Sequence, residues 1–192
     1  MIVTGGNQGL GLYICQAFGA TSVSRSNGYD IGVDQESLVQ ATLNDNIFVN
    51  NAYDGEFGKV DGKFAQTQLL NRIALAWKQL GKTGHIINIG GSASSTKDVP
   101  DMALDLYAAN KAALRYHSHQ WSRAFKHNTV KFKTTLLNID RLSTDRGRQS
   151  PDWNGNGHEL EDIIKMINLC LTLPDSVCIE EITAWVNLDH KQ

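Results

Sequence analysis

The sequence predicts an α/β protein with a mostly parallel, seven-stranded sheet and helices on both faces. Two observations lead to this prediction. Short apolar runs alternate along the chain with longer stretches in which apolar residues recur at helical spacing. A glycine-rich turn follows the first apolar run directly, as expected where a strand leads into a helix. Such alternation is typical of parallel βαβ units, whose right-handed crossovers produce a doubly wound, Rossmann-like sheet.

Each element follows from the local pattern. Strands are expected at residues 2–4, 21–24, 29–31, 46–50, 85–89, 130–139 and 179–186. Helices are expected at residues 10–18, 35–43, 64–80, 102–125 and 159–171. Asp34 is placed to cap the second helix, and Gly81 and Gly84 end the third. Residues 54–63 and 140–157 are polar and are expected to be loops.

Length and composition restrict the class of protein. The 192 residues suit a single domain spanning residues 1–192. A formal net charge of −2 does not favour a protein that binds nucleic acid through its phosphates. No apolar run is long enough to cross a bilayer, and the chain begins directly with a strand-like run, so neither a membrane span nor a signal peptide is expected. Three cysteines without a CxxC pair favour a reducing, cytoplasmic location.

The first candidate site is the run TGGNQGLG at residues 4–11, between the first strand and the first helix. Glycines permit a tight turn and let the backbone approach a pyrophosphate, while the helix N-terminus supplies N–H donors and a partial positive charge. An ordinary glycine-rich turn is the alternative. The position of the run at the start of a βαβ unit favours a dinucleotide site made by Thr4, Gly5, Asn7, Gln8, Gly9, Leu10 and Gly11.

The end of the second strand bears on the identity of the cofactor. NAD sites usually carry an acid there, but this chain has Ser24, Arg25 and Ser26. A guanidinium and two hydroxyls would bind a 2′-phosphate, which a carboxylate would repel. NADP(H) is therefore predicted as the preferred cofactor, with NAD(H) as the other candidate. The alternative is that Arg25 is simply a solvated residue at a strand end.

The second candidate site is the pair Tyr107 and Lys111. Four residues apart on an expected helix, they lie on the same face. A tyrosine alone has a pKa of about 10, and a neighbouring ammonium lowers that pKa, so that the phenol can exchange a proton near neutral pH. A core tyrosine beside a surface lysine is the alternative for this pair considered alone.

Together these motifs resemble those of the short-chain dehydrogenase/reductase family, and the chain resembles a compact, divergent member of it. Residues 4–11 match the family's TGxxxGxG loop, and residues 50–53 (NNAY) resemble its NNAG signature with Tyr in the Gly position. Residues 85–91 resemble the strand that leads to the catalytic serine, and residues 107–111 match YxxxK. Residues 139–144 fall where the family has PGxxxT, and of that motif only the threonine is kept.

The resemblance implies an oxidoreductase that transfers a hydride between a nicotinamide cofactor and a carbonyl or secondary alcohol. Tyr107 would be the general acid/base, and Lys111 would bind the nicotinamide ribose and lower the pKa of Tyr107. The resemblance also implies a homodimer or homotetramer, and no metal is needed for this chemistry. The further cofactor contacts that it implies are Asp30 at the adenine, Asn50, Asn51 and Ala52 along the adenosine, and Thr144 at the nicotinamide carboxamide.

Two departures from the family leave alternatives open. The position of the catalytic serine holds Gly91, so Ser92 is favoured as the oxyanion donor and Ser94 is the alternative. The family's helix asparagine, which organises a proton-relay water, is expected near residues 64–66 but is not clearly placed, and Asn71 is a weak candidate. A catalytically impaired, cofactor-sensing module of the same fold is therefore the alternative function.

Overall fold

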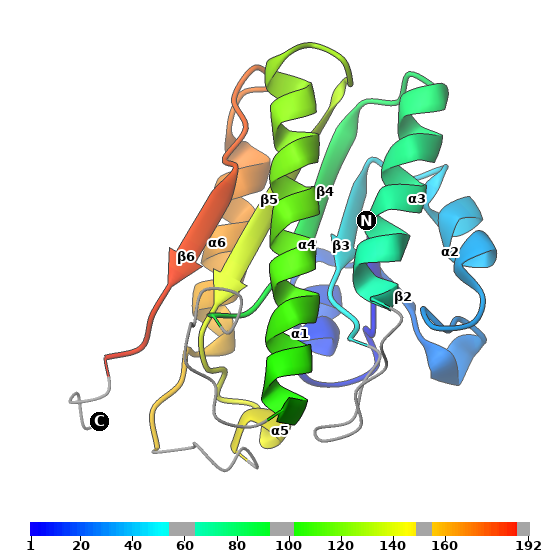
Figure 1. Cartoon of the computed structure of the whole chain (residues 1–192). Helices are drawn as coiled ribbons and strands as arrows, with labels where there is room; N and C mark the ends of the chain where they lie inside the picture. The colour runs from blue at the N-terminus through cyan, green and yellow to red at the C-terminus, as the bar shows by residue number, and fades with distance from the viewer. Residues whose placement is uncertain (54–63, 93–101, 149–154, 188–192) are drawn as a thin grey trace.

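The fold is a six-stranded sheet in which every strand runs parallel to its neighbours (Figure 1). This computed structural model describes residues 1–53, 64–92, 102–148 and 155–187. The order β2-β1-β3-β4-β5-β6 reverses between β1 and β3, which confirms the predicted doubly wound, Rossmann-like class. The strands are β1 (Ile2–Thr4), β2 (Thr21–Val23), β3 (Ile47–Asn50), β4 (Gly84–Ile89), β5 (Phe132–Ile139) and β6 (Glu181–Ala184).

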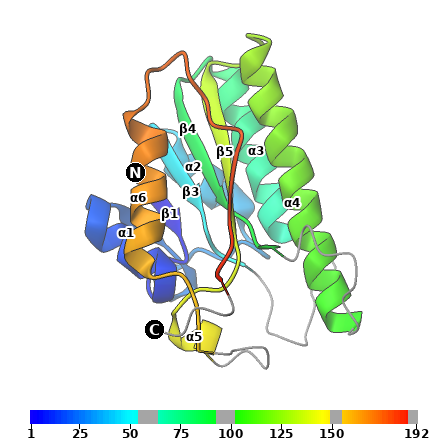
Figure 2. The same ribbon diagram turned by 90° about the vertical axis from the view of Figure 1, so that its left-hand side faces the viewer.

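Helices cover both faces of the sheet. The helices are α1 (Gly9–Phe18), α2 (Gln35–Thr42), α3 (Ala65–Gln79), α4 (Met102–Lys126), α5 (Asp145–Arg148) and α6 (Leu160–Thr172), with a single 3-10 turn, η1, at Arg25–Asn27. Helices α2, α3 and α4 pack on one face, and α1 and α6 pack on the other (Figure 2). None of the helices in the described ranges combines the length and the apolar character that a membrane span requires.

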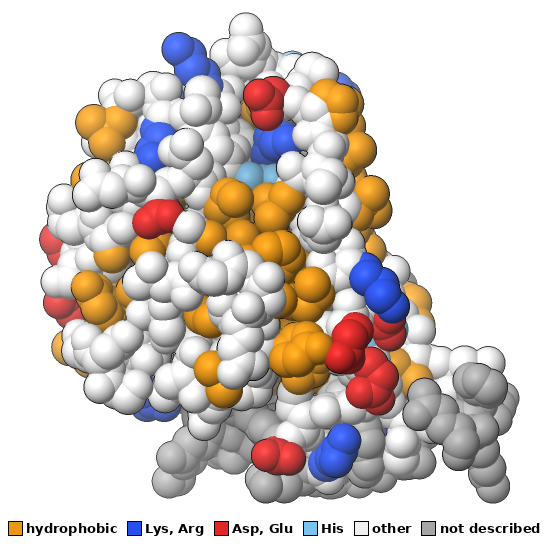
Figure 3. All heavy atoms as spheres, turned by 180° about the vertical axis from the view of Figure 1, so that it is seen from behind, with side chains coloured by type: hydrophobic (Ala, Val, Ile, Leu, Met, Phe, Trp, Pro, Cys, Tyr) orange, Lys and Arg blue, Asp and Glu red, His pale blue; other side chains and the backbone are white. Residues whose placement is uncertain are grey.

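Two layers of apolar side chains enclose the sheet. Because successive strand residues point to opposite faces, Ile86 and Ile87 of β4 enter different layers. In the layer under α2, α3 and α4, Trp77 is fully buried and its indole N–H donates to the Thr42 hydroxyl at 3.2 Å. Hydrophobic side chains reach the surface in the middle of the face that α1 and α6 cover (Figure 3). The partly buried residues packed against this layer include Cys15, Phe18, Ile164, Met166 and Leu171.

The predicted third strand is wrong, so the sheet has six strands and not seven. After β2 the chain turns through η1 and Gly28, whose φ is 91°. The Asp30 carboxylate then accepts the N–H of Gly32 at 2.8 Å, and the Asp30 carbonyl accepts the N–H of Asp34 at 2.9 Å. These turn hydrogen bonds replace a strand ladder at residues 29–31, and β2 becomes the edge of the sheet.

The other predicted elements lie where the pattern placed them. The Asp34 side chain caps α2 by accepting the N–H of Ser37 at 3.1 Å. Gly81, with a φ of 60°, follows the end of α3 as predicted. The predicted loop at residues 54–63 lies outside the described residues, and the predicted loop at residues 140–157 contains the short helix α5.

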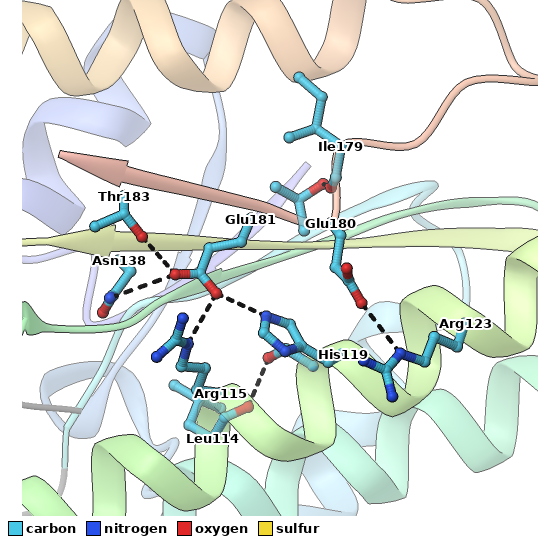
Figure 4. A network of polar contacts seen from close by, with 11 residues as sticks. Leu114, Arg115, His119, Arg123, Asn138, Ile179, Glu180, Glu181 and Thr183 are labelled. Atoms are coloured by element: carbon cyan, nitrogen blue, oxygen red, sulfur yellow. Dashed lines mark hydrogen bonds and ion pairs between the residues drawn. The ribbon is translucent and has the colours of Figure 1, made fainter. Parts of the chain in front are cut away.

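The edge strand β6 is joined to α4 by a carboxylate network (Figure 4). One Glu181 carboxylate oxygen accepts from Arg115 Nε at 2.9 Å and from His119 Nε2 at 2.7 Å. The other oxygen accepts from the Thr183 hydroxyl and from Asn138 Nδ2, the latter at 3.5 Å. Burial opposes the charged carboxylate, but the hydrogen bonds from Thr183, Arg115 and His119 and the charge of Arg115 outweigh it and lower the pKa of Glu181.

This network predicts how the stability depends on pH. We expect Glu181→Gln to lower the free energy of unfolding at neutral pH by roughly 1–3 kcal/mol, because four donors lose a charged acceptor. A lowered folded pKa stabilises the protein above the unfolded value of about 4.3, and that contribution is lost as the pH falls through the folded pKa. The difference between wild type and variant in chemical denaturation should therefore shrink in acid.

The matched control is Glu180→Gln, since Glu180 is exposed and pairs with Arg123 at 3.5 Å. We expect this change to alter the free energy of unfolding by less than about 0.5 kcal/mol, both at neutral pH and in acid. Equal effects of the two substitutions would contradict the role given to the network.

Candidate active site

A cavity of about 500 Å³ is lined by residues that follow the carboxyl ends of β1, β2, β3 and β5. It lies at the point where the strand order reverses, which is where open α/β sheets bind their ligands. The predicted site residues that line it are Gly5, Asn7, Gln8, Gly9, Leu10, Gly11, Ser24, Arg25, Asp30, Asn51, Ala52 and Thr144. Lining residues that the sequence did not indicate are Val23, Tyr29, Ile31, Tyr53, Leu142 and Asp145.

The glycine-rich loop brings backbone to this cavity. A Cβ added at Gly11 would lie 2.2 Å from the carbonyl oxygen of Gly5, so only glycine fits there. No side chain caps the N-terminus of α1, and its first turn carries no acid. The N–H groups and the positive end of the helix dipole therefore face the cavity, where a phosphate would be stabilised.

Five of the predicted cofactor residues do not line the cavity, namely Thr4, Ser26, Asn50, Tyr107 and Lys111. The first three have other contacts. The Thr4 hydroxyl accepts the N–H groups of Asn51 and Ala52, both at 2.9 Å, so Thr4 fixes the turn after β3. Ser26 is exposed and lies next to a residue that lines the cavity, since its hydroxyl contacts Ser24 Oγ at 3.0 Å. Asn50 is fully buried and joins the polar network described below.

The structure brings Tyr107 and Lys111 together beside β4. The Lys111 ammonium lies 5.6 Å from the centre of the Tyr107 ring. A Cβ added at Gly91 would lie 3.0 Å from the Tyr107 hydroxyl oxygen, so that hydroxyl sits directly against the Gly91 backbone. Lys111 is only 4% exposed, which excludes the alternative of a surface lysine.

A buried amide, Gln66, holds the lysine. Gln66 Oε1 accepts from Lys111 Nζ at 2.9 Å, and Gln66 Nε2 donates to the carbonyls of Asn50 at 2.8 Å and Ile89 at 3.1 Å. Since Lys111 can only donate and the two carbonyls can only accept, the orientation of the amide is fixed. Asn50 Nδ2 in turn donates to the Gln66 carbonyl at 3.0 Å and to Asn88 Oδ1 at 2.9 Å.

Gln66 lies within the segment where the resemblance placed a helix asparagine. The family pattern did not indicate Gln66, because that pattern calls for asparagine and not glutamine. Asn71, the weak candidate, lies elsewhere. Its Oδ1 accepts from the Trp121 indole at 2.9 Å, and its Nδ2 contacts His117 Nδ1 at 3.2 Å. Asn71 therefore joins α3 to α4 and does not reach Lys111.

Tyr53 connects the cavity to the Tyr107–Lys111 pair. It lines the cavity, and its ring packs edge-on against the Tyr107 ring with centres 5.1 Å apart and planes at 81°. The Lys111 ammonium lies 5.2 Å from the centre of the same Tyr53 ring. The cavity and the candidate proton-transfer pair thus adjoin each other at Tyr53.

Ser92 has an unexpected partner. Its hydroxyl donates to Asp140 Oδ1 at 2.8 Å, across the carboxyl ends of β4 and β5. Asp140 follows β5 directly, in the segment where the family carries PGxxxT, and no sequence motif pointed to it. Ser94, the alternative candidate, lies outside the described residues.

Similar solved structures are dehydrogenases and a reductase. Serine dehydrogenase from Escherichia coli is 18% identical, with a TM-score of 0.67 over 100% of this chain and 99% of that chain. A 3-ketoacyl-(acyl-carrier-protein) reductase from Brucella melitensis, complexed with NADH, is 16% identical, with a TM-score of 0.71 over 95% of each chain. A short chain dehydrogenase from Leptospira borgpetersenii with bound NAD+ is 17% identical, with a TM-score of 0.67 over 94% of this chain and 88% of that chain.

The sequence itself matches no protein-family model and no curated protein. The structural similarity extends over almost the whole chain at low identity, so it establishes a shared fold. It confirms, at the level of fold, the resemblance to short-chain dehydrogenases/reductases that the motifs indicated.

The Gln66 contacts predict a large loss of stability when the amide is removed. Gln66→Leu removes one hydrogen-bond partner from a buried ammonium and from two buried carbonyls, so we expect the free energy of unfolding to fall by roughly 2–4 kcal/mol. Gln68→Leu, two residues further along α3 at an exposed position, is the control and should change it by less than about 0.5 kcal/mol. Chemical denaturation of the two variants measures the difference. Similar losses of stability in both would contradict the role given to the Gln66 hydrogen bonds.

Proposed function

We propose that this protein is an NAD(P)-dependent oxidoreductase that interconverts a carbonyl and a secondary alcohol. One observation carries the proposal: Tyr53, which lines the cavity over the glycine-rich loop, packs against the ring of Tyr107, and the Tyr107 ring lies beside a buried lysine. The similar structures that bind NADP+, NADPH or NADH support it, since they share the fold.

The residues present fit a dinucleotide. The α1 N-terminus and the backbone close to Gly11 would hold the pyrophosphate, and Asn51, Ala52 and Thr144 line the same cavity. When bound, the nicotinamide would supply or accept the hydride.

The protein's own residues would supply and accept the proton that the reaction exchanges with the substrate oxygen. The Tyr107 hydroxyl would give its proton to the substrate oxygen in reduction and take it back in oxidation. Lys111, whose contacts with Gln66 and Ile89 are with neutral oxygens, keeps its positive charge available to stabilise the tyrosinate. The oxyanion role expected of Ser92 would require its hydroxyl to leave Asp140, so Tyr107 is the hydroxyl donor that the observed geometry favours.

NADP(H) is the preferred cofactor in this proposal. Arg25 and Ser24 line the cavity at the end of β2, and Asn7 Nδ2 reaches Ser26 Oγ at 3.2 Å beside them. A cation and hydroxyl groups at this place suit a 2′-phosphate. The similar structures do not decide the matter, because NADP+ and NADH are both found among them.

A cofactor-sensing module without turnover is the second candidate. Two observations favour it: the Ser92 proton is directed to Asp140, and the Tyr53 ring packs on Tyr107 where the resembled family has glycine. Such a module would bind the dinucleotide by the same loop and would not require the Tyr107 hydroxyl.

The proposed contact between Arg25 and the 2′-phosphate predicts how Arg25→Ala changes cofactor affinity. We expect NADPH to bind about tenfold or more weakly, because a charge-assisted contact with the 2′-phosphate is lost, while NADH affinity changes little. Nicotinamide fluorescence titrations measure both constants. Arg72→Ala, at an exposed α3 position paired with Glu36, is the control. An equal loss of affinity for NADPH and NADH would show that Arg25 does not bind the 2′-phosphate.

Removal of one hydroxyl separates the two candidate functions. For an oxidoreductase, Tyr107→Phe should lower NADPH-dependent reduction of the best substrate in a carbonyl screen by roughly a hundredfold or more, with NADPH affinity retained. Tyr116→Phe, on the exposed face of the same helix, should leave the rate unchanged. A wild-type protein that binds NADPH but reduces no carbonyl would favour the sensing module instead.

A further inference from the structure

The hydrogen bond between Ser92 and Asp140 determines what Ser92 can offer a ligand. A serine hydroxyl has one proton, and a carboxylate is an acceptor, so the bond of 2.8 Å uses that proton. Ser92 then presents only lone pairs to a neighbouring group. Together the two side chains present acceptor oxygens and one full negative charge.

This pair lies next to the proposed reaction centre. Ser92 follows Gly91, whose backbone sits against the Tyr107 hydroxyl. Asp140 is held from the other side, because its N–H donates to the Ala184 carbonyl at 3.1 Å and so continues the β5–β6 ladder. Two residues beyond Asp140, Leu142 already lines the dinucleotide cavity. The pair therefore lies at the carboxyl edge of the sheet, one residue from the Gly91 backbone that contacts Tyr107 and two residues from the cavity lining.

The charge of Asp140 is not cancelled by a protein cation. Among the described residues, Ser92 is the one side chain that bonds to the Asp140 carboxylate, and none of their lysines or arginines forms an ion pair with it. Asp145, which also lines the cavity, adds a second acid at this edge. A positive group placed directly against the Asp140 carboxylate is therefore attracted to it, and an anion placed there is repelled.

We propose that Ser92 and Asp140 form a substrate subsite for a protonated amine close to the reacting carbon. The proposal rests on the proposed function and deepens it, by naming amino alcohols and the matching amino ketones as the substrate class. An ammonium donates to both oxygens and neutralises the carboxylate, whereas a substrate carboxylate at the same place would meet only acceptors and a like charge.

Three small secondary alcohols of the form CH3–CH(OH)–X test the subsite. They are 1-amino-2-propanol, which carries an ammonium, 2-butanol, which is neutral, and lactate, which is an anion. Ligand-observed NMR on the full chain with NADPH, with which the alcohols cannot react, gives their dissociation constants. We expect the amino alcohol to bind about tenfold more tightly than 2-butanol, since one charge-assisted hydrogen bond contributes about that factor, and lactate to bind most weakly.

The variant Asp140→Asn keeps the shape of the side chain and removes its charge. It should bring the affinities for 1-amino-2-propanol and 2-butanol to within about threefold of each other. Asp175→Asn, at an exposed turn before β6, is the matched control and should preserve the difference. Equal affinities in the wild type, undetectable binding of the amino alcohol, or a preference that survives Asp140→Asn would each overturn the subsite.

A separate readout distinguishes failure of the subsite from failure of the proposed function. Fluorescence titration with NADPH reports whether the dinucleotide binds at all, and it does not depend on Asp140. Absence of NADPH binding would overturn the oxidoreductase. NADPH binding without amine preference would overturn the subsite and leave the oxidoreductase standing.

Discussion

The buried amide of Gln66 is the contact on which the geometry of the site depends. It joins the carboxyl ends of β3 and β4 through two carbonyls and holds the ammonium of Lys111 from α4. Each of its polar atoms meets a partner of fixed hydrogen-bonding type, so the arrangement has one low-energy form. Two strands and two helices are thereby set relative to one another at the edge where the chemistry is proposed.

This arrangement also explains how a lysine is tolerated in the interior. Lys111 donates to the Gln66 amide oxygen and to the Ile89 carbonyl, and both of these acceptors are neutral oxygens. The Tyr53 and Tyr107 rings present their faces to the same ammonium. A buried positive charge beside a phenol is the electrostatic condition for proton exchange at Tyr107.

Local patterns predicted most of the fold, and pairing between distant segments accounts for the main error. The helix at α2 was predictable because Asp34 supplies the cap within four residues of the helix start. The local sequence at residues 29–31 could not decide whether a strand forms there, because a strand forms only where a neighbouring strand pairs with it. There the Asp30 side chain and carbonyl bond within their own turn.

The same distinction holds for the site. The glycine loop and the YxxxK pair have fixed spacing on one element each, so the sequence indicated them. Gln66 and Asp140 act through contacts with residues 45 and 48 positions away, and no short motif encodes such contacts. Ser92 follows Gly91 after the end of β4, and the destination of its proton depends on Asp140, which only the folded sheet brings near.

A crystal structure of the protein with NADPH tests the continuity of cavity and reaction centre most directly. The pyrophosphate should lie over the N-terminus of α1, the 2′-phosphate at Arg25, and the nicotinamide within reach of the Tyr107 hydroxyl. A dinucleotide bound at the glycine loop whose nicotinamide is held away from Tyr107 by the Tyr53 ring would contradict an oxidoreductase and would favour a protein that only senses the cofactor.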